Sequence, residues 1–256
     1  MQGPDDSPIV DGVQEFRLSH WREFHDYVHG DSLLSDYVWR GQGDADWSLV
    51  TSLHRLLSDV TDIDMESAAK DHLAAFRQAV RGRRGPNPPK IQDENQLWAL
   101  GQHVGLATPL LDWTESPYVA LFFAFANPAP PASGNRVVWQ LFAGDDTMSG
   151  GTDAGAERRW PSLEILRPDQ DENPRLVSQR GLFARVPLGE SVDAWVRRNL
   201  AGESTDVYLA KIVIPDHDRD DCLRHLNRMN INHLSLFPDL IGASNYCNQA
   251  LLIENY

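Results

Sequence analysis

Apolar positions along the chain follow helical spacing in some segments and strand composition in others. Side chains repeating every three or four residues, together with start or stop signals, predict helices over about 20–29, 64–80, 93–104 and 116–125. Asp93 with Gln96 resembles a capping box, and Ser116-Pro117 is typical of an N-cap followed by a first-turn proline. Further helices are expected near 218–229 and from Pro238 onward.

Short runs rich in β-branched and aromatic residues predict strands near 37–39, 108–111, 136–142, 182–186 and 207–214. Because Gly41 and Gly43 follow the first run, we expect that strand to stop there, with Arg40 at its end. The pattern predicts an α+β fold in which a central mixed or antiparallel sheet is flanked by helices. We expect a leader over 1–18 and a single domain over 19–256.

The charge of the chain limits which macromolecules we expect it to bind. The formal net charge is −14 over 256 residues, so the surface as a whole repels phosphate polymers, and nucleic acid is expected to bind only locally. Residues 77–90 are the place for such binding, because they carry no acid and five cations: Arg77, Arg81, Arg83, Arg84 and Lys90. The structural alternative is a solvated Pro/Gly loop.

The chain shows no sign of a membrane span or of secretion. No apolar run approaches the roughly 20 residues that a spanning helix needs, and no signal peptide is visible, so we expect a soluble cytoplasmic protein without a membrane partner. Cys222 and Cys247 lack the spacing of a zinc site or a disulfide framework. His25 and His29 lie four positions apart without a third ligand, and no metal is expected.

Polar side chains gather where predicted strands meet loops or helices, the usual position of a site held by a rigid frame. Arg40, beside two glycines and Gln42, can offer a flat bidentate donor to a phosphate or carboxylate. The alternative is a structural ion pair with a carboxylate such as Asp112. Around "NPRLVSQRGLF", Arg175 and Gln179 flank a predicted strand start, which suits either a ligand contact or an ordinary loop.

The stretch "QHVGLATPLLDWTESP" holds several further candidates. His103, at a predicted helix end where the dipole favours protonation, can act as acid, base or donor. Asp112 can orient His103 or Arg40, and Trp113 can stack on a planar ring. The structural alternatives are a capping imidazole, and a buried ion pair beside a core tryptophan. Two hydroxyls of this stretch are capping groups that can also face an anion at a helix N-terminus, those of Thr114 and Ser116.

Four blocks in order from about 37 to 240 resemble the FRG domain, named for a Phe-Arg-Gly triplet that reads Trp39-Arg40-Gly41 here. "YVWRGQGDADWSLVTSLHR" resembles the opening signature and "WALGQHVGLATPLLDWTESPYVALFFAFA" the central block. "PRLVSQRGLF" and "LSLFPDL" are similar to the third and last blocks. The chain departs from the pattern at Trp39 and at Leu110, where many members carry arginine.

A weaker resemblance is to the arginine class of ADP-ribosyltransferases. It implies that Arg40 binds a phosphate or ribose of NAD, that Thr114 and Ser116 approximate a hydroxyl motif, and that the fold is similar. Those enzymes also need a glutamate, whose carboxylate stabilises the charge that develops as nicotinamide leaves. Residues 178–181 read Ser-Gln-Arg-Gly, so Asp112 or Asp239 would have to replace it.

The leading hypothesis is a cleft that binds a nucleotide-like small molecule, NAD above all, and cleaves it with transfer to a macromolecular acceptor or to water. The resemblance implies a role as a bacterial toxin or phage-defence effector. One alternative is a nuclease with His103 and Asp112 as the acid/base pair. Another is a non-catalytic nucleotide-sensing module. In the leading hypothesis and in the nucleotide-sensing alternative the same residues line the cleft: Arg40, Gln42, His103, Asp112, Trp113, Arg175 and Gln179.

Overall fold

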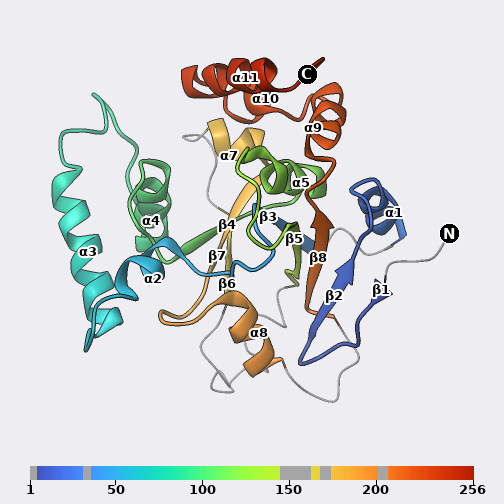
Figure 1. Cartoon of the computed structure of the whole chain (residues 1–256). Coiled ribbons are helices and arrows are strands. Elements are labelled where there is room, and N and C mark those ends of the chain that lie inside the picture. The colour runs from blue at the N-terminus through green and yellow to red at the C-terminus, as the bar shows by residue number, and fades with distance from the viewer. Residues whose placement is uncertain (1–4, 31–35, 145–162, 168–173, 201–206) are drawn as a thin grey trace.

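An eight-stranded mixed sheet runs through the molecule in the order β1-β2-β8-β5-β3-β4-β7-β6 (Figure 1). The computed structural model describes residues 5–30, 36–144, 163–167, 174–200 and 207–256. β2 and β8 pair in parallel and the other neighbours pair antiparallel. The strands are β1 (Asp5–Asp6), β2 (Val13–Arg17), β3 (Tyr37–Gln42), β4 (Leu110–Thr114), β5 (Asn135–Phe142), β6 (Glu164–Leu166), β7 (Gly181–Arg185) and β8 (Leu209–Pro215).

Helices cover both faces of this sheet, which confirms the α+β class (Figure 1). In the described residues they are α1 (Glu23–Gly30), α2 (Ser52–Leu57), α3 (Met65–Ala79), α4 (Glu94–His103), α5 (Pro117–Ala126), α7 (Pro174–Ser178), α8 (Val192–Asn199), α9 (Arg219–Arg228), α10 (His233–Leu236) and α11 (Leu240–Leu252). None of them is long and apolar enough to cross a bilayer. β2, which pairs with β8, lies in the segment expected as a leader.

Successive side chains of each strand point to opposite faces of the sheet, so apolar residues of the strands lie on both faces. One face packs Val38 and Leu111 against Trp195 of α8. The opposite face packs Trp39 against Phe24 of α1 and Phe122 of α5. A third cluster lies at the β4–β7 end of the sheet, under α3 and α4, and includes Leu73, Leu97, Leu110 and Phe183.

Three predicted helix starts are confirmed, and each depends on contacts within one turn, whereas α1 begins at Glu23 rather than at about residue 20 and α11 begins at Leu240 rather than at Pro238. Asp64 accepts hydrogen bonds from Glu66 N and Ser67 N at the start of α3. Asp93 accepts one from Gln96 N at the start of α4. Ser116 accepts one from Val119 N at the start of α5, with Pro117 in the first turn.

Two strand predictions are wrong in their limits. β4 begins at Leu110 rather than 108 and includes Asp112 and Trp113, and β3 continues through Gly41 to Gln42. Gly41 does not end the strand. A Cβ atom there would lie 1.9 Å from Ala120 O and 2.5 Å from Ala124 N, so the missing side chain lets α5 lie directly against β3. Arg40 is therefore held inside a strand, with a helix pressed against the residue beside it.

Several elements that the sequence analysis did not predict contain eight residues or fewer, among them β2, β6, α2, α7, α8 and α10. Three of these helices have N-cap residues that the analysis missed: Thr51 for α2, Ser191 for α8 and Asn232 for α10. The spacing of Val104 from Leu97 and Leu100 predicts a buried position, but α4 ends at His103 and Val104 is exposed. The Asp/Gly-rich composition of residues 144–155 predicts a surface loop, and this segment lies outside the described residues except for Gly144.

Candidate functional site

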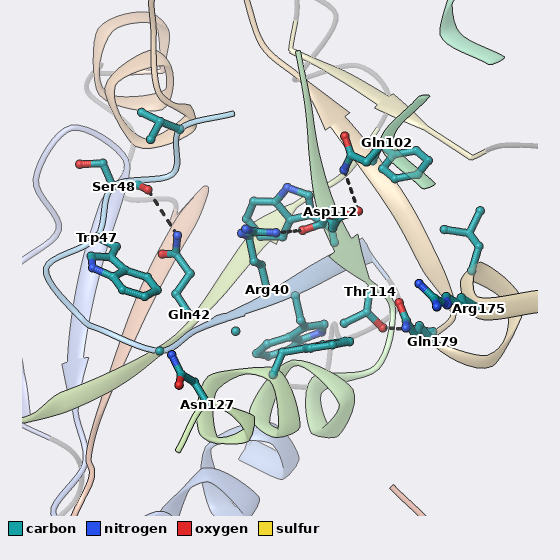
Figure 2. A pocket seen from close by; sticks show the side chains of 18 of the residues that line it. Arg40, Gln42, Trp47, Ser48, Gln102, Asp112, Thr114, Asn127, Arg175 and Gln179 are labelled. Atoms are coloured by element: carbon teal, nitrogen blue, oxygen red, sulfur yellow. Dashed lines mark hydrogen bonds between the residues drawn. The ribbon is translucent and has the colours of Figure 1, made fainter. Parts of the chain in front are cut away.

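A cavity of about 1020 Å³ opens where β3 and β4 separate (Figure 2). These two strands pair only through Trp39 and Thr114, whereas β4 and β7 pair along all five residues of β4. Side chains from both strands, and from α2, α4 and α7, line the cavity. It brings together the following residues singled out from the sequence: Arg40, Gln42, His103, Asp112, Trp113, Thr114, Arg175 and Gln179. Ser116 is not among its lining residues.

Arg40 reaches across the gap between the separated strands. Its Nη1 donates a hydrogen bond of 2.6 Å to the backbone carbonyl of Asp112, which β3 no longer pairs with. Its buried Nε has no hydrogen-bond partner, and in the described residues Arg40 forms no ion pair. Burial lowers the pKa of the guanidinium, the charge of Asp112 raises it, and the charge of Arg55 lowers it. Arg40 remains cationic, because the guanidinium group is the most basic side chain in proteins.

The Asp112 carboxylate is held by Gln102, and the expectation that it orients His103 or bonds to Arg40 is wrong. Gln102 Nε2 donates to Asp112 Oδ1 at 2.8 Å (Figure 2). Thr108 Oγ1 donates in turn to Gln102 Oε1. His103 lies exposed at the cavity rim, without a hydrogen bond to any described residue. Gln102 was missed, although it lies one helical turn after the buried Trp98 and hence on the inner side of α4.

A second guanidinium, that of Arg55, also lines the cavity. It belongs to α2, donates to Val50 O at 2.7 Å, and makes no ion pair within the described part of the chain. Arg40 and Arg55 line the same cavity, and they are close enough for the charge of Arg55 to lower the pKa of Arg40. Sequence reasoning missed Arg55, whose only signal was its place at the end of the block "YVWRGQGDADWSLVTSLHR".

Three tryptophans line the cavity, and two of them, Trp113 and Trp47, have different environments. Trp113 is 3% exposed and packs in the core, so it forms part of the wall, and its Nε1 has no partner in the described residues. Trp47, on the loop after β3, is 53% exposed (Figure 2). Its ring, and not that of Trp113 as the sequence suggested, is available for stacking. Gln42 is fixed between Trp139 Nε1 at 2.7 Å and Ser48 O at 3.3 Å.

Comparison with known proteins identifies the region that holds most of this cavity. The family model of the FRG domain matches residues 35–133. The chain contains an FRG domain. No curated protein and no solved structure matches the chain. The matched residues span β3 to α5, so Arg40, Arg55 and Asp112 belong to the FRG domain, while Arg175 and Gln179 follow the matched segment.

The hydroxyl groups of Thr114 and Ser116, at and just after the end of β4, form hydrogen bonds with neighbouring main-chain groups of the protein. Thr114 Oγ1 donates to Gln179 O at 2.6 Å and accepts a hydrogen bond from Ser116 N at 3.0 Å (Figure 2). Ser116 Oγ caps α5 through Val119 N at 3.4 Å. Gln179 Nε2 in turn donates to Leu236 O at 3.1 Å. These contacts tie β4 to the α7–β7 turn and to α10, and they set the shape of the cavity at this end.

Arg175 lies in α7, rather than at the strand start expected from the sequence, and is paired with Asp239. Its Nη2 and Nε lie 2.5 and 2.6 Å from Asp239 Oδ2, and its guanidinium lies over the Phe237 ring. The hydrogen bond from Gly242 N, with Arg175 nearby, lowers the pKa of Asp239, which caps α11. Asp239 does not line the cavity. Of the two aspartates that the sequence analysis considered as replacements for the glutamate, Asp112 is therefore the one that lies beside Arg40 and Arg55 in the cavity.

In the described ranges, no group of three or more His, Cys, Asp or Glu side chains is placed to hold a metal ion. The rings of His25 and His29 contact each other edge to face with centroids 4.2 Å apart, and His25 Nδ1 is 2.7 Å from Tyr118 Oη. Cys222 is buried and Cys247 exposed, and both are free thiols.

Proposed function

We propose that the cavity of the FRG domain binds a nucleotide-like anion and that NAD is its ligand. The observation that carries this proposal is the pair of guanidiniums, Arg40 and Arg55, which face one cavity without an ion-pair partner in the described residues. In a chain of net charge −14, two guanidiniums that line one cavity without forming an ion pair within the described residues favour an anionic ligand. Guanidinium groups suit phosphate because their donors match its oxygens in pairs.

The size and lining of the cavity support a dinucleotide. Its volume of about 1020 Å³ is at the upper end of small-molecule pockets, which hold about 300–1,000 Å³. The space accommodates two nucleosides joined through a pyrophosphate. The exposed ring of Trp47 offers a stacking surface for adenine or nicotinamide, and Arg40 and Arg55 lie where phosphate charge is needed.

The proposal includes cleavage of the bond between nicotinamide and ribose. Asp112 is the carboxylate for this step: Gln102 holds Oδ1, and Oδ2 has no hydrogen-bond partner within the described residues. Its charge would stabilise the positive charge on ribose as nicotinamide leaves with the bonding electron pair. Water or a macromolecular nucleophile then adds to the ribose carbon and releases a proton. Continued consumption of NAD in a cell is the link to a toxin or phage-defence role.

Calorimetric titration with NAD and measurement of nicotinamide release test both parts. We expect Arg55→Gln to weaken NAD binding by tenfold or more, because charge-assisted hydrogen bonds contribute about 1.5–3 kcal/mol. Arg197→Gln is the matched control, since Arg197 is also exposed and, among the described residues, donates only to a main-chain oxygen, Val10 O. Asp112→Asn should retain NAD binding and abolish release.

Each other outcome has a defined meaning. No binding of NAD by the wild-type protein, or equal losses in the Arg55 and Arg197 variants, overturns the ligand proposal. Tight binding without release by the wild type leaves a non-catalytic nucleotide-sensing module. Cleavage of RNA or DNA that depends on His103 and Asp112 would replace the proposal with a nuclease, a reading that the Gln102–Asp112 hydrogen bond supports less.

A further inference from the structure

A second hollow, of about 390 Å³, lies between the C-terminal end of α3 and the loop that leads to α4. It shares no lining residue with the cavity between β3 and β4. In Figure 1 this loop forms an outer edge of the molecule, well away from the sheet. The two sites are therefore separate, and binding at this hollow does not depend on the ligand proposed for the cavity between β3 and β4.

Cations without acidic neighbours in the sequence surround this hollow. Arg77, Arg81 and Arg84 line it, and Arg83 and Lys90 belong to the same segment, which we call the basic loop (residues 77–90). Arg77, Arg81, Arg83 and Lys90 form no ion pair in the part of the chain that the structure describes. A helix C-terminus stabilises nearby cations, which accounts for Arg77 and Arg81 but not for cations up to eleven positions beyond Ala79, the last residue of α3.

The basic loop has a defined conformation. Arg84 Nη2 donates to Pro89 O at 2.7 Å, and Arg81 Nη1 donates to Gln78 Oε1 at 3.1 Å. Gly82 and Gly85 turn the chain with φ angles of +70° and +85°. The floor of the hollow is apolar and consists of Val80, Ile91 and Leu97. Because these contacts hold the loop, its arginines lie around a defined recess. A loop that is only solvated would not form such a recess.

We propose that the basic loop binds the phosphate backbone of a single-stranded nucleic acid. Five cations along 14 residues fit a polymer of phosphates better than a single phosphate group. A membrane surface is disfavoured because residues 77–92 contain no exposed large apolar side chain to insert. At physiological salt the Debye length is about 8 Å, so the charges of more distant acidic residues are screened. The attraction of the loop for phosphate then depends on the charges of the loop itself.

The lining also defines the type of recognition. No aromatic side chain lines this hollow, so stacking of successive bases is not expected. Its apolar floor suits the sugar of one nucleotide, while the arginines bind the phosphates on either side. Phosphate contacts of this kind position a strand without reading its sequence. Binding should therefore be independent of sequence and strongly dependent on salt.

Fluorescence anisotropy with a labelled mixed-sequence 20-nucleotide RNA, and with the DNA of the same sequence, tests the proposal. For three to five phosphate contacts we expect affinity to fall about 10- to 100-fold between 50 and 200 mM salt. The double variant Arg77→Gln/Arg81→Gln should bind more weakly and reduce the slope of log K against log salt by about 1.4. Circular dichroism checks that this variant is folded.

The matched control is Lys70→Gln/Arg228→Gln. It also removes two positive charges, one from the exposed side of α3 and one from the last turn of α9, and both side chains are exposed. This control should bind like the wild type. The proposal is overturned if the wild type does not bind RNA or DNA at 50 mM salt, if both double variants lose affinity equally, or if only a phosphopeptide or vesicles of anionic lipid bind.

Discussion

Arg40 and Trp47 show how single residues give the cavity its chemistry. Arg40 is anchored by one main-chain carbonyl, so its charge stays available to a ligand. Trp47 leaves about half of its surface exposed in a protein whose other cavity tryptophans, Trp39 and Trp113, are buried. An aromatic ring kept in contact with water at a cavity wall favours a role in stacking over a role in the core.

At this scale we predict that Trp47→Ala weakens NAD binding about tenfold or more, because stacking of one base on an aromatic ring contributes about 1–3 kcal/mol. Trp47→Phe retains a ring and should lose much less affinity. Calorimetric titration of both variants measures the difference. Equal affinity in the wild type and in Trp47→Ala would show that this ring does not contact the ligand.

At the scale of elements, α5 and β3 together form the base of the cavity. α5 begins at the Ser116 cap and ends where arginine side chains bind its last carbonyls: Arg136 Nη1 donates to Ala124 O, and Arg219 Nε donates to Phe125 O. These donors replace the hydrogen bonds that a helix end lacks. α5 lies against β3 at Gly41, which explains why a glycine follows the cavity arginine.

We predict that Gly41→Ala lowers the free energy of unfolding by at least about 1–3 kcal/mol, because its Cβ would lie 1.9 Å from Ala120 O and force the helix away from the strand. Gly43→Ala is the matched control two residues on, where the nearest atom to an added Cβ is 3.5 Å away. It should change stability by no more than about 0.5 kcal/mol. Urea denaturation followed by circular dichroism compares the two, and similar losses would contradict the close approach.

At the scale of the whole molecule, the buried carboxylate of Asp44 links distant loops and makes stability depend on pH. Asp44, after β3, accepts hydrogen bonds from Ala132 N at 2.6 Å and Ser133 N at 3.4 Å, near the start of β5. Burial raises the pKa of Asp44, but the hydrogen bonds from Ser133, Asp46 and Ala132 outweigh it and lower the pKa below its usual value. The folded protein therefore favours the charged carboxylate.

The sign of the pH effect follows from the lowered pKa. Asp44 contributes stability that is fully present above the unfolded pKa of about 3.9 and is lost as the pH falls through the lower, folded value. We predict that Asp44→Asn is destabilised at pH 7 and that its difference from the wild type shrinks at pH 3. Urea unfolding at pH 7, 5 and 3 measures this. The exposed Asp59→Asn should show little difference at any pH, and a constant deficit in Asp44→Asn would contradict the prediction.

The sequence by itself determined the longer helices, most of the strands and many of the residue types that line the cavity. Caps such as Asp64, Asp93 and Ser116 act within one turn, so neighbouring residues are sufficient to predict them. The tertiary structure decided which polar groups meet. Gln102 rather than His103 binds Asp112, and Arg55 joins Arg40, because these contacts depend on the separation of β3 from β4 and on the approach of α2 and α4. Strand register and helix packing are set by contacts between residues far apart in the chain, and local patterns do not encode them.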